Sequence, residues 1–419
     1  MNFQSFNLNP KILKAIDDAG YSEPTLIQQK AIPKILDGLD IRGSAQTGSG
    51  KTAAFLLPVL HQMVTKSPRE GKGPRVLILV PTRELGMQIA DHAEKYSKYL
   101  SKTKTVSISG GIPYNKQLPK LKRPHEILIA TPGRLIDFMR QKKISFDRLE
   151  MLILDEADRM LDMGFLPSVE EIVQALPLER QTLLFTATFT KSIQKLSEDI
   201  LSEPEDLIIH SAKTKHENID QKLHYVDDLH HKNRLLDHIL NDNSVYNAII
   251  FTSTKRHADQ LVGELCEKGH KAGALHGDMN QRKRTQTLIN LRKGRINLLV
   301  ATDVAARGID IDSITHVINF DLPQNPEDYV HRIGRTGRAG ANGTALSFAS
   351  NRDKEMVRRI EKFTEQSFVV HEIEGLAPQK KQKSSRSSKS SKFSRSSRSS
   401  RPDFNKRFQR KKKPAFRKK

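Results

Sequence analysis

The chain has 419 residues, of which 37% are hydrophobic, and 70 Lys and Arg against 48 Asp and Glu give it a net charge of +22. The length predicts two or three domains, and the composition excludes a fibrous or wholly disordered protein. The single cysteine, Cys266, excludes an internal disulfide and a cysteine-based zinc site and favours a reducing compartment.

No apolar stretch approaches the ~18 residues that a membrane span needs. The amino-terminal segment also lacks the apolar core of a secretory signal. We therefore expect a cytoplasmic protein with no membrane partner.

Short apolar runs recur along the chain in two series. The first lies at 75–80, 126–130, 151–154 and 181–185, and the second at 247–251, 297–301, 316–320 and 344–348. These runs are continuous rather than alternating, which is typical of parallel strands buried on both faces. Helical stretches such as 83–99 and 134–140 separate them, so the sequence predicts two α/β sheets covered by helices. In such sheets ligands bind beyond the carboxyl ends of the strands.

A glycine-rich segment at 45–52 reads Ala-Gln-Thr-Gly-Ser-Gly-Lys-Thr. Glycines let backbone N–H groups approach phosphates, and the start of the following helix adds its positive dipole end. We expect Lys51 to hold the β and γ phosphates and Thr52 to ligate Mg²⁺. The strict pattern has glycine where this chain has Ala45, and a chance glycine turn in a surface loop is the alternative.

A second element, the acidic tetrad Asp155-Glu156-Ala157-Asp158, follows the apolar run 151–154. A carboxylate at a buried strand end can hold Mg²⁺ through water, and its neighbour can orient and deprotonate an attacking water. Acidic tetrads also occur at solvated helix starts. Together with the glycine-rich segment, however, this one predicts an ATPase site.

Over about 370 residues the chain resembles the DEAD-box RNA helicases, a family named after the tetrad at 155–158. The matching segments, in the order of that family, are 20–28, 45–52, 81–85, 110–111, 131–134, 155–158, 186–188, 281–284, 301–308 and 331–338. In that family an alanine at the position of Ala45 is normal. Thr186 departs from the usual serine but keeps the hydroxyl, which puts in doubt only the coupling that it serves.

The resemblance implies an α/β fold of two tandem RecA-like parallel-sheet domains of the P-loop NTPase type, followed by a disordered basic tail. The implied parts are a Q-motif segment at 1–30, the ATP-binding domain at 31–208, a linker at 209–218, the C-terminal helicase domain at 219–377 and the tail at 378–419.

The resemblance also implies the ATP-binding residues, which are Phe3, Gln28, Ala45, Gln46, Thr47, Gly48, Ser49, Gly50, Lys51, Thr52 and Asp303. The carboxamide of Gln28 would read adenine by accepting from its amine and donating to its ring nitrogen. Phe3 would pack near the base, although an ordinary buried phenylalanine is an equal alternative. Asp303 would meet the ribose from the second domain.

The catalytic residues that the resemblance implies are Lys51, Asp155, Glu156, Arg335 and Arg338, with Thr52 and Asp155 holding Mg²⁺. The two arginines lie in the second series, and arginines brought to a γ phosphate stabilise the charge of phosphoryl transfer. Hydrolysis would therefore require the two domains to close. Asp158, Thr186, Thr188 and His331 are the implied coupling residues.

The same closure would assemble a track for one RNA strand. The implied contacts are Arg83, Gly110, Gly111, Thr131, Arg134, Gln281, Arg284 and Thr302. Contacts to the backbone carry no base information, and contacts to the 2′-OH favour RNA, so we expect no DNA partner. The helix at 134–140 would bend the strand, which predicts local separation of short duplexes.

The charge concentrates at the carboxyl end, where residues 379–419 hold 18 basic residues and one acidic residue, Asp403, and so carry +17. From Arg386 to Arg401 a basic residue recurs at every third position, with serine nearly everywhere between. Such a composition cannot bury a core, which predicts disorder. Phe404, Phe408 and Phe416 lie among further basic residues, a pattern typical of a non-specific nucleic-acid tether. The alternative is a solvated tail with no partner.

The leading hypothesis is an RNA-dependent ATPase that separates short duplexes or strips bound proteins. The competing hypothesis is a nucleotide-gated RNA clamp, which Glu156 disfavours, and a DNA translocase matches the motifs less well. Within the family, the short amino terminus, compact core and basic serine-rich tail look most like the bacterial RhlE-like group, with ribosome or RNA-decay components as candidate partners. The adjacent His230 and His231 are expected at the surface.

Overall fold

The computed structural model describes residues 2–45, 48–101, 103–208, 218–242, 245–306, 313–337 and 341–379. Most of the predicted linker at 209–218 and of the predicted tail at 378–419 lies outside these residues, as do Gln46, Thr47 and Arg338. In the described parts of the chain, no helix is both long and apolar enough to cross a membrane.

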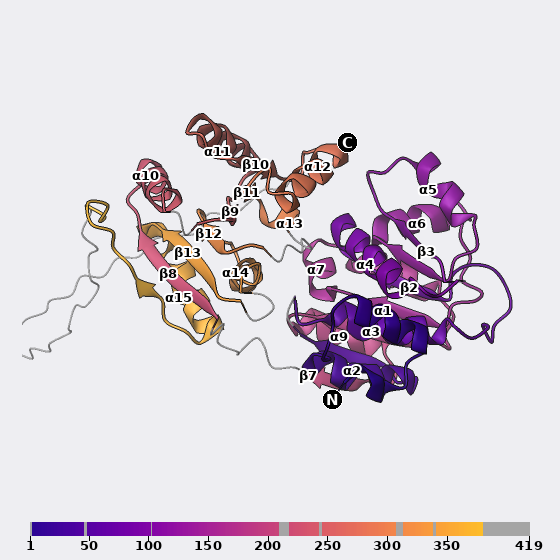
Figure 1. Cartoon of the computed structure of the whole chain (residues 1–419). Coiled ribbons are helices and arrows are strands. Elements are labelled where there is room, and N and C mark those ends of the chain that lie inside the picture. The colour runs from indigo at the N-terminus through magenta and orange to yellow at the C-terminus, as the bar shows by residue number, and fades with distance from the viewer. Residues whose placement is uncertain are drawn as a thin grey trace, which may run out of the picture. The chain divides into compact units, whose positions relative to one another are not determined.

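The first sheet consists of seven parallel strands in the order β3-β4-β2-β5-β6-β1-β7 (Figure 1). They are β1 (Ile41–Ser44), β2 (Val76–Leu79), β3 (Thr105–Ile108), β4 (Ile127–Ala130), β5 (Met151–Leu154), β6 (Gln181–Thr186) and β7 (Glu205–Ile208). Both faces are covered, because Ile78 and Ile153 belong to one hydrophobic cluster and their neighbours Leu77 and Leu152 to another. Successive side chains of a strand point to opposite faces, so these runs had to be continuously apolar.

Helices precede the first strand of this sheet and connect its strands. They are η1 (Phe3–Phe6), α1 (Pro10–Asp18), α2 (Leu26–Leu36), α3 (Lys51–Gln62), α4 (Arg83–Tyr96), α5 (Tyr114–Leu121), α6 (Pro132–Arg140), α7 (Ala157–Asp162), α8 (Leu166–Gln174) and α9 (Lys191–Ile200). The start of α4 is fixed by Thr82, whose hydroxyl accepts a hydrogen bond from the Leu85 N–H. A side-chain cap of this kind satisfies one of the free N–H groups at a helix start.

The second sheet repeats the order of the first, as β10-β11-β9-β12-β13-β8-β14, again with parallel pairs throughout. Its strands are β8 (Ile219–Tyr225), β9 (Ala248–Phe251), β10 (Ala272–Leu275), β11 (Leu298–Ala301), β12 (His316–Asn319), β13 (Gly343–Ala349) and β14 (Val369–Val370). Its helices are α10 (Leu229–Leu240), α11 (Lys255–Glu267), α12 (Gln281–Arg292), α13 (Asp303–Ala306), α14 (Pro326–Ile333), η2 (Asn351–Asp353) and α15 (Lys354–Thr364). The predicted fold class of two tandem parallel-sheet domains is confirmed.

One expectation about the second sheet was wrong. His231 is buried rather than at the surface, with 8% of its area exposed. Its Nδ1 accepts a hydrogen bond from the Asp227 N–H, and its Nε2 lies 2.9 Å from the Leu376 carbonyl oxygen. This burial was not predictable from the sequence, because Leu376 lies 145 residues away along the chain.

Candidate active site

The glycine-rich loop joins the end of β1 at Ser44 to the start of α3 at Lys51. Gly48 and Gly50 have φ angles of 82° and 92°, in the left-handed region that favours glycine. The loop thus presents backbone N–H groups at a helix start, where an anion is stabilised. The predicted Gln46 and Thr47 lie outside the described residues.

A buried cation and a buried carboxylate lie next to this loop. Lys51 is 6% exposed, and its Nζ has no hydrogen-bond partner among the described residues. Asp155, at the end of β5, is 2% exposed. Burial raises its pKa to about 6, Lys51 opposes this rise, and the neighbouring Glu156 adds to it. Because an unpartnered buried ammonium is costly, this arrangement fits an anionic ligand, and the oxygen of Asp155 fits a hard cation.

Glu156 begins α7 in an unusual backbone conformation. Its φ is 53°, in the left-handed region, and its N–H donates to the Asp155 Oδ1 at 3.0 Å. Such a conformation costs about 1–3 kcal/mol for a residue other than glycine, and it is found where function requires a fixed direction. The Glu156 side chain is thereby held at the carboxyl edge of the first sheet.

Arg335 approaches the same carboxylate from the second sheet. It is 7% exposed, and burial lowers its pKa, an effect that the charge of Glu156 opposes and the charge of Arg159 strengthens. The structure thus brings a predicted arginine of one sheet within electrostatic reach of a predicted carboxylate of the other. Arg338, its predicted companion, lies outside the described residues.

Three of the four predicted coupling residues form a hydrogen-bond network. Asp158 Oδ2 accepts from the Ala187 N–H at 3.1 Å and from the N–H and hydroxyl of Thr188 at 2.9 and 3.0 Å. Thr186 donates its hydroxyl to the Thr188 carbonyl at 2.8 Å, so the threonine fills this position as a serine hydroxyl would. His331 lies on α14, and its Nδ1 is buried without a hydrogen-bond partner in the described part of the chain.

The residues predicted to read the base are held by the loop and the core. Gln28 donates its amide to the Gly50 carbonyl at 3.1 Å and accepts from the Thr25 N–H at 3.0 Å. Any Cβ at position 50 would lie 2.5 Å from the Gln28 Nε2, so glycine is required there. Phe3 is buried in a hydrophobic cluster, with its ring edge-on to Phe6 at 6.2 Å.

Asp303 begins α13 and is held by a neighbouring arginine. Arg332 donates to both of its carboxylate oxygens, at 2.6 and 2.7 Å. Arg332 is 2% exposed and lies over the Phe251 ring at 4.8 Å. Such a two-pronged bond fixes the orientation of the Asp303 carboxylate.

The predicted RNA-contacting residues lie in two adjoining groups. Arg83 donates to the Gln281 Oε1 at 2.8 Å, and its guanidinium lies close to Gly111, whose φ of 71° is in the left-handed region that favours glycine. The Gly110 N–H donates to the Thr131 hydroxyl at 3.3 Å. Burial lowers the pKa of Arg83, as do the nearby charges of Arg284 and Arg134. Three cations are thus gathered near one backbone segment, and gathered cations favour phosphate.

Arg134 and Thr302 complete the predicted set. Arg134 donates to the Ile112 carbonyl at 2.7 Å and lies over the Tyr114 ring at 4.2 Å. Thr302 follows β11, and its N–H donates to the Leu275 carbonyl at 3.2 Å.

Sequence reasoning missed four residues that organise this region. Arg159 contacts Asp328 at 2.6 Å, and Glu84 accepts from Arg284 at 2.9 Å, so both pairs join the two sheets. Arg332 is the fourth, through its bond to Asp303. All lie in or beside the matched motifs, but only the folded chain brings such distant partners together, as 169 residues separate Arg159 from Asp328.

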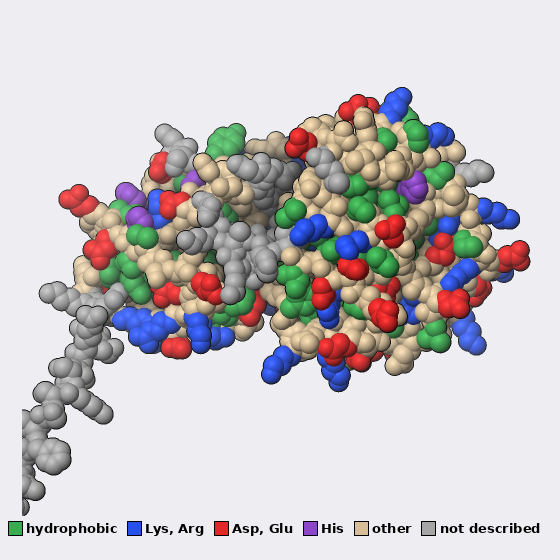
Figure 2. Space-filling view, turned by 90° about the horizontal axis from the view of Figure 1, so that it is seen from below, with side chains coloured by type: hydrophobic (Ala, Val, Ile, Leu, Met, Phe, Trp, Pro, Cys, Tyr) green, Lys and Arg blue, Asp and Glu red, His purple; other side chains and the backbone are tan. Residues whose placement is uncertain are grey.

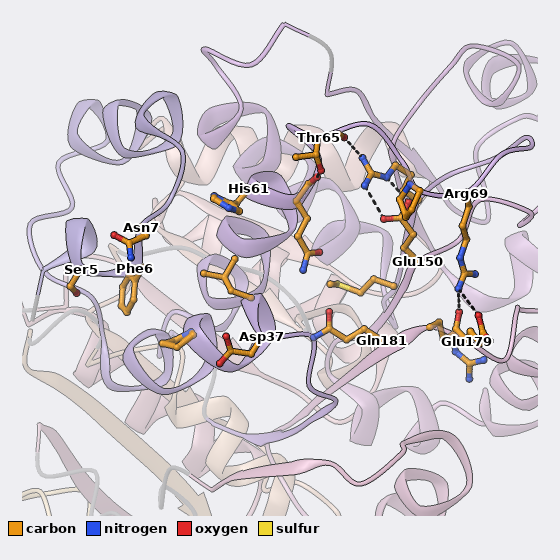
Figure 3. Close-up of a pocket in the computed structure, with 17 residues that line it drawn as sticks. Ser5, Phe6, Asn7, Asp37, His61, Thr65, Arg69, Glu150, Glu179 and Gln181 are labelled. Atoms are coloured by element: carbon orange, nitrogen blue, oxygen red, sulfur yellow. Dashed lines mark hydrogen bonds and ion pairs between the residues drawn. The ribbon is translucent and has the colours of Figure 1, made fainter.

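A large groove of about 900 Å³ lies elsewhere, at the amino ends of the first sheet's strands (Figure 3). Arg75 crosses it to bind both oxygens of Glu150, at 2.7 and 2.8 Å, and Arg69 donates to the Leu149 carbonyl. None of the predicted site residues lines this groove. This groove is therefore separate from the candidate active site, which lies at the carboxyl edge of the first sheet.

Comparisons with known proteins agree with this geometry. The family described as DEAD/DEAH box helicase matches residues 25–196, and the helicase conserved C-terminal domain matches residues 231–340. The ATP-dependent RNA helicase RhlB of Pseudomonas syringae pv. tomato is 44% identical over 86% of this chain and 91% of its own. The ATP-dependent RNA helicase SrmB of Escherichia coli is 40% identical over 90% of this chain and 85% of its own.

Two solved structures are similar across both sheets. S. cerevisiae Dbp5 bound to RNA and ADP BeF3 has a TM-score of 0.80 at 30% identity, covering 88% of this chain and 95% of that one. Mss116p bound to ssRNA and AMP-PNP has a TM-score of 0.81 at 30% identity, covering 89% of this chain and 80% of that one.

Proposed function

Because the chain belongs to the DEAD-box family and is an ATP-dependent RNA helicase, we infer that one ATP is shared between its two sheets and drives local strand separation. ATP use and RNA as partner follow from the family. The assignment of the individual residues and of the domain limits 31–208 and 219–377 is our proposal.

The nucleotide would lie on the glycine-rich loop. The unpartnered Nζ of buried Lys51 would contact the β and γ phosphates, while Gly48 and Gly50 expose backbone N–H groups to them. Thr52 and Asp155 would hold Mg²⁺, which neutralises charge on the phosphates when bound. The raised pKa of Asp155 supports this role, since a nearby cation relieves the burial of its charge.

The base and ribose would be held by Gln28, near Phe3, and by Asp303. Gln28 connects the loop to α2, so its carboxamide lies beside Gly50. To bind adenine, this carboxamide would have to exchange one of its present hydrogen bonds for a bond to the base. Arg332 directs the carboxylate of Asp303. The site would thereby discriminate against guanine, because the oxygen of guanine would face the acceptor oxygen of the Gln28 carboxamide.

Hydrolysis would use residues from both sheets. Glu156, fixed by its left-handed backbone, would orient and deprotonate the attacking water. Arg335, with Arg338, would stabilise the charge that develops on the γ phosphate. Because Arg335 belongs to the other sheet, hydrolysis requires both sheets to be in place. The single observation that carries the proposal is that Arg335 lines one small cavity together with Asp303 and with Arg159 of the first sheet.

Hydrolysis would be coupled to RNA through residues of both sheets. Asp158 ties the tetrad to Thr186 and Thr188, and His331 lies on the same helix as Asp328. The strand would contact Arg83, Gly110, Gly111, Thr131 and Arg134 from one sheet and Gln281, Arg284 and Thr302 from the other. Helix α6 would bend it. Since stacking is worth roughly 1.4 kcal/mol per step in DNA, closure can open a few base pairs but not a long duplex.

We further propose membership of the RhlE-like group and a cytoplasmic location, with ribosome assembly or RNA decay as the setting. The serine-rich basic segment of the sequence supports the group assignment, and the single cysteine fits a reducing compartment.

The test measures ATP hydrolysis with and without RNA, and unwinding of duplexes of about 10 and about 40 base pairs. We expect RNA to stimulate hydrolysis and the unwinding yield to fall with duplex length. A Glu156→Gln control should bind both ligands and stall. Hydrolysis absent from the parent would favour the clamp, and a yield independent of length would contradict local separation.

A further inference from the structure

Helix α12 and the turn after it are unusual in charge. Residues 280–302 contain six Lys and Arg and no Asp or Glu, a net charge of +6, whereas residues 1–378 as a whole carry only +5. On most of the face drawn in Figure 2, by contrast, acidic and basic side chains are interspersed, apart from one group of basic side chains at the lower left. The cations of this segment are Arg282, Lys283, Arg284, Arg292, Lys293 and Arg295.

Most of these cations are available to a partner. Arg284 is engaged by Glu84, but Arg282, Arg292, Lys293 and Arg295 are exposed. No ion pair joins these four to a carboxylate among the described residues. Cations that are neither paired nor buried can bind an anionic ligand without first losing an ion pair.

The cluster continues the proposed RNA track. Arg292 follows Gln281 by 11 residues, about three helical turns, so it lies on the same side of α12 about 16 Å further along. Gln281 and Arg284, at the start of the helix, are already proposed RNA contacts. At 3.4 Å per phosphate along a duplex strand, the far end of α12 is about five nucleotides beyond them.

A tight turn fixes the far end of the cluster. Gly294 has a φ of 66°, and the Arg295 N–H donates to the Asn290 carbonyl at 2.8 Å. This pattern is a Schellman helix end, which stops α12 and turns the chain sharply. Arg292, Lys293 and Arg295 are thereby gathered around a single turn.

Charge and surface character favour nucleic acid over protein at this place. Apart from Ile289, which is 36% exposed, the outward positions of α12 are polar or cationic. A protein interface normally has a buried apolar or aromatic centre, which this face lacks. A phosphate backbone, in contrast, can be bound by Lys and Arg alone, and this binding requires little shape complementarity between the two surfaces.

We propose that Arg292, Lys293 and Arg295 form a second phosphate-binding site, which grips the backbone of RNA outside the core track. This inference rests on the proposed function, because it needs RNA on Gln281 and Arg284. The site contributes affinity for long substrates without reading bases. It would keep the helicase bound to an RNA after the core track has released its short segment of that RNA.

The experiment uses the full chain carrying Arg292→Gln, Lys293→Gln and Arg295→Gln together. The matched control replaces three exposed cations on α15 in the same way: Arg358→Gln, Arg359→Gln and Lys362→Gln. Affinity is measured with a non-hydrolysable ATP analogue at several salt concentrations, for a 5-nucleotide single strand, which is too short to reach from Gln281 to the far end of α12, and for a 12-base-pair duplex carrying a 20-nucleotide overhang. The tail is present throughout and contributes equally to every variant.

For the α12 variant we expect about tenfold weaker binding of the long RNA and a salt slope smaller by about 2, since each single-strand phosphate contact contributes about 0.7. The short strand should bind and stimulate hydrolysis as in the parent, and the α15 control should match the parent. Unchanged affinity and slope for the long RNA, or an equal loss in the control, would overturn the proposal.

Two further readouts separate the alternatives. Cations near a helix end also stabilise its dipole, so a lower melting temperature with unchanged RNA binding would assign the three residues a structural role and overturn the proposal. If the short strand fails to stimulate hydrolysis by the parent, the proposed function itself fails. If the short strand stimulates hydrolysis by the parent, and the α12 variant binds the long RNA as tightly as the parent does, only the second site is refuted.

Discussion

Replacing Asp328 by Asn tests whether a buried ion pair holds the two sheets together. Asp328 Oδ1 lies 2.6 Å from Arg159 Nη1, with side-chain exposures of 11% and 4%. Arg159 directly follows the acidic tetrad, and Asp328 lies in the first turn of α14, the helix that leads to Arg335. The pair therefore forms only when the two catalytic edges face each other.

The magnitude follows from the burial and from a neighbouring carboxylate. Removing one partner of a buried pair costs about 3–5 kcal/mol. Asp162 also lies 3.3 Å from the same nitrogen and remains in the variant, although it is 51% exposed. We therefore take the lower end, about 3 kcal/mol, which is roughly a hundredfold shift of the closure equilibrium.

The assay is RNA-dependent ATP hydrolysis over a range of RNA concentrations. The Asp328→Asn variant should need roughly a hundredfold more RNA for half-maximal hydrolysis, while its RNA binding without nucleotide stays unchanged. Asp162→Asn is the matched control, because it removes the exposed carboxylate from the same guanidinium, and it should change little. Equal behaviour of both variants, or no change in Asp328→Asn, would refute the reasoning.

Three other outcomes are expected. Glu156→Gln should lower single-turnover hydrolysis about 10²- to 10⁴-fold with ATP and RNA affinity kept, and normal hydrolysis would remove its role as base. Thr188→Val removes one of the three donors to the Asp158 Oδ2 and should lower duplex separation several-fold more than hydrolysis, whereas equal losses would argue against coupling. The raised pKa of Asp155, about 6 instead of 3.8, means that its buried charge destabilises the nucleotide-free fold above pH 6. In nucleotide-free protein, Asp155→Asn should melt at a higher temperature than the parent at pH 7.5. This difference in melting temperature should vanish as the pH falls towards 4. A lower melting temperature of the variant at pH 7.5 would contradict the raised pKa of Asp155.

The sequence predicted the central strands well, because burial on both faces demands continuous apolar runs. The run at 151–154 coincides with β5, and the helix expected at 83–99 is α4 over Arg83–Tyr96. Strands with small or charged residues were not predicted. In β1, Ile-Arg-Gly-Ser, the glycine is needed because a Cβ on Gly43 would lie 2.7 Å from the Phe185 ring, a contact that no local pattern reveals.

The site was predictable where motifs specify backbone conformation and single charges. Lys51 beside Asp155 and the bonds from Asp158 to Thr188 join residues that the motifs had already named. Pairs between distant segments were not predictable. The bond from Arg332 to Asp303 depends on how α14 and the end of β11 pack, which sequence spacing does not encode.

Fluorescence transfer between the two sheets tests the shared-ATP account most directly. One dye can be placed on Cys266, which is exposed, and the other on a Leu178→Cys variant, since Leu178 is 95% exposed. We expect the transfer efficiency to change when ATP analogue and RNA are added together and to change little with either alone. A transfer efficiency that stays the same with both ligands present would contradict the sharing of one triphosphate between the two sheets.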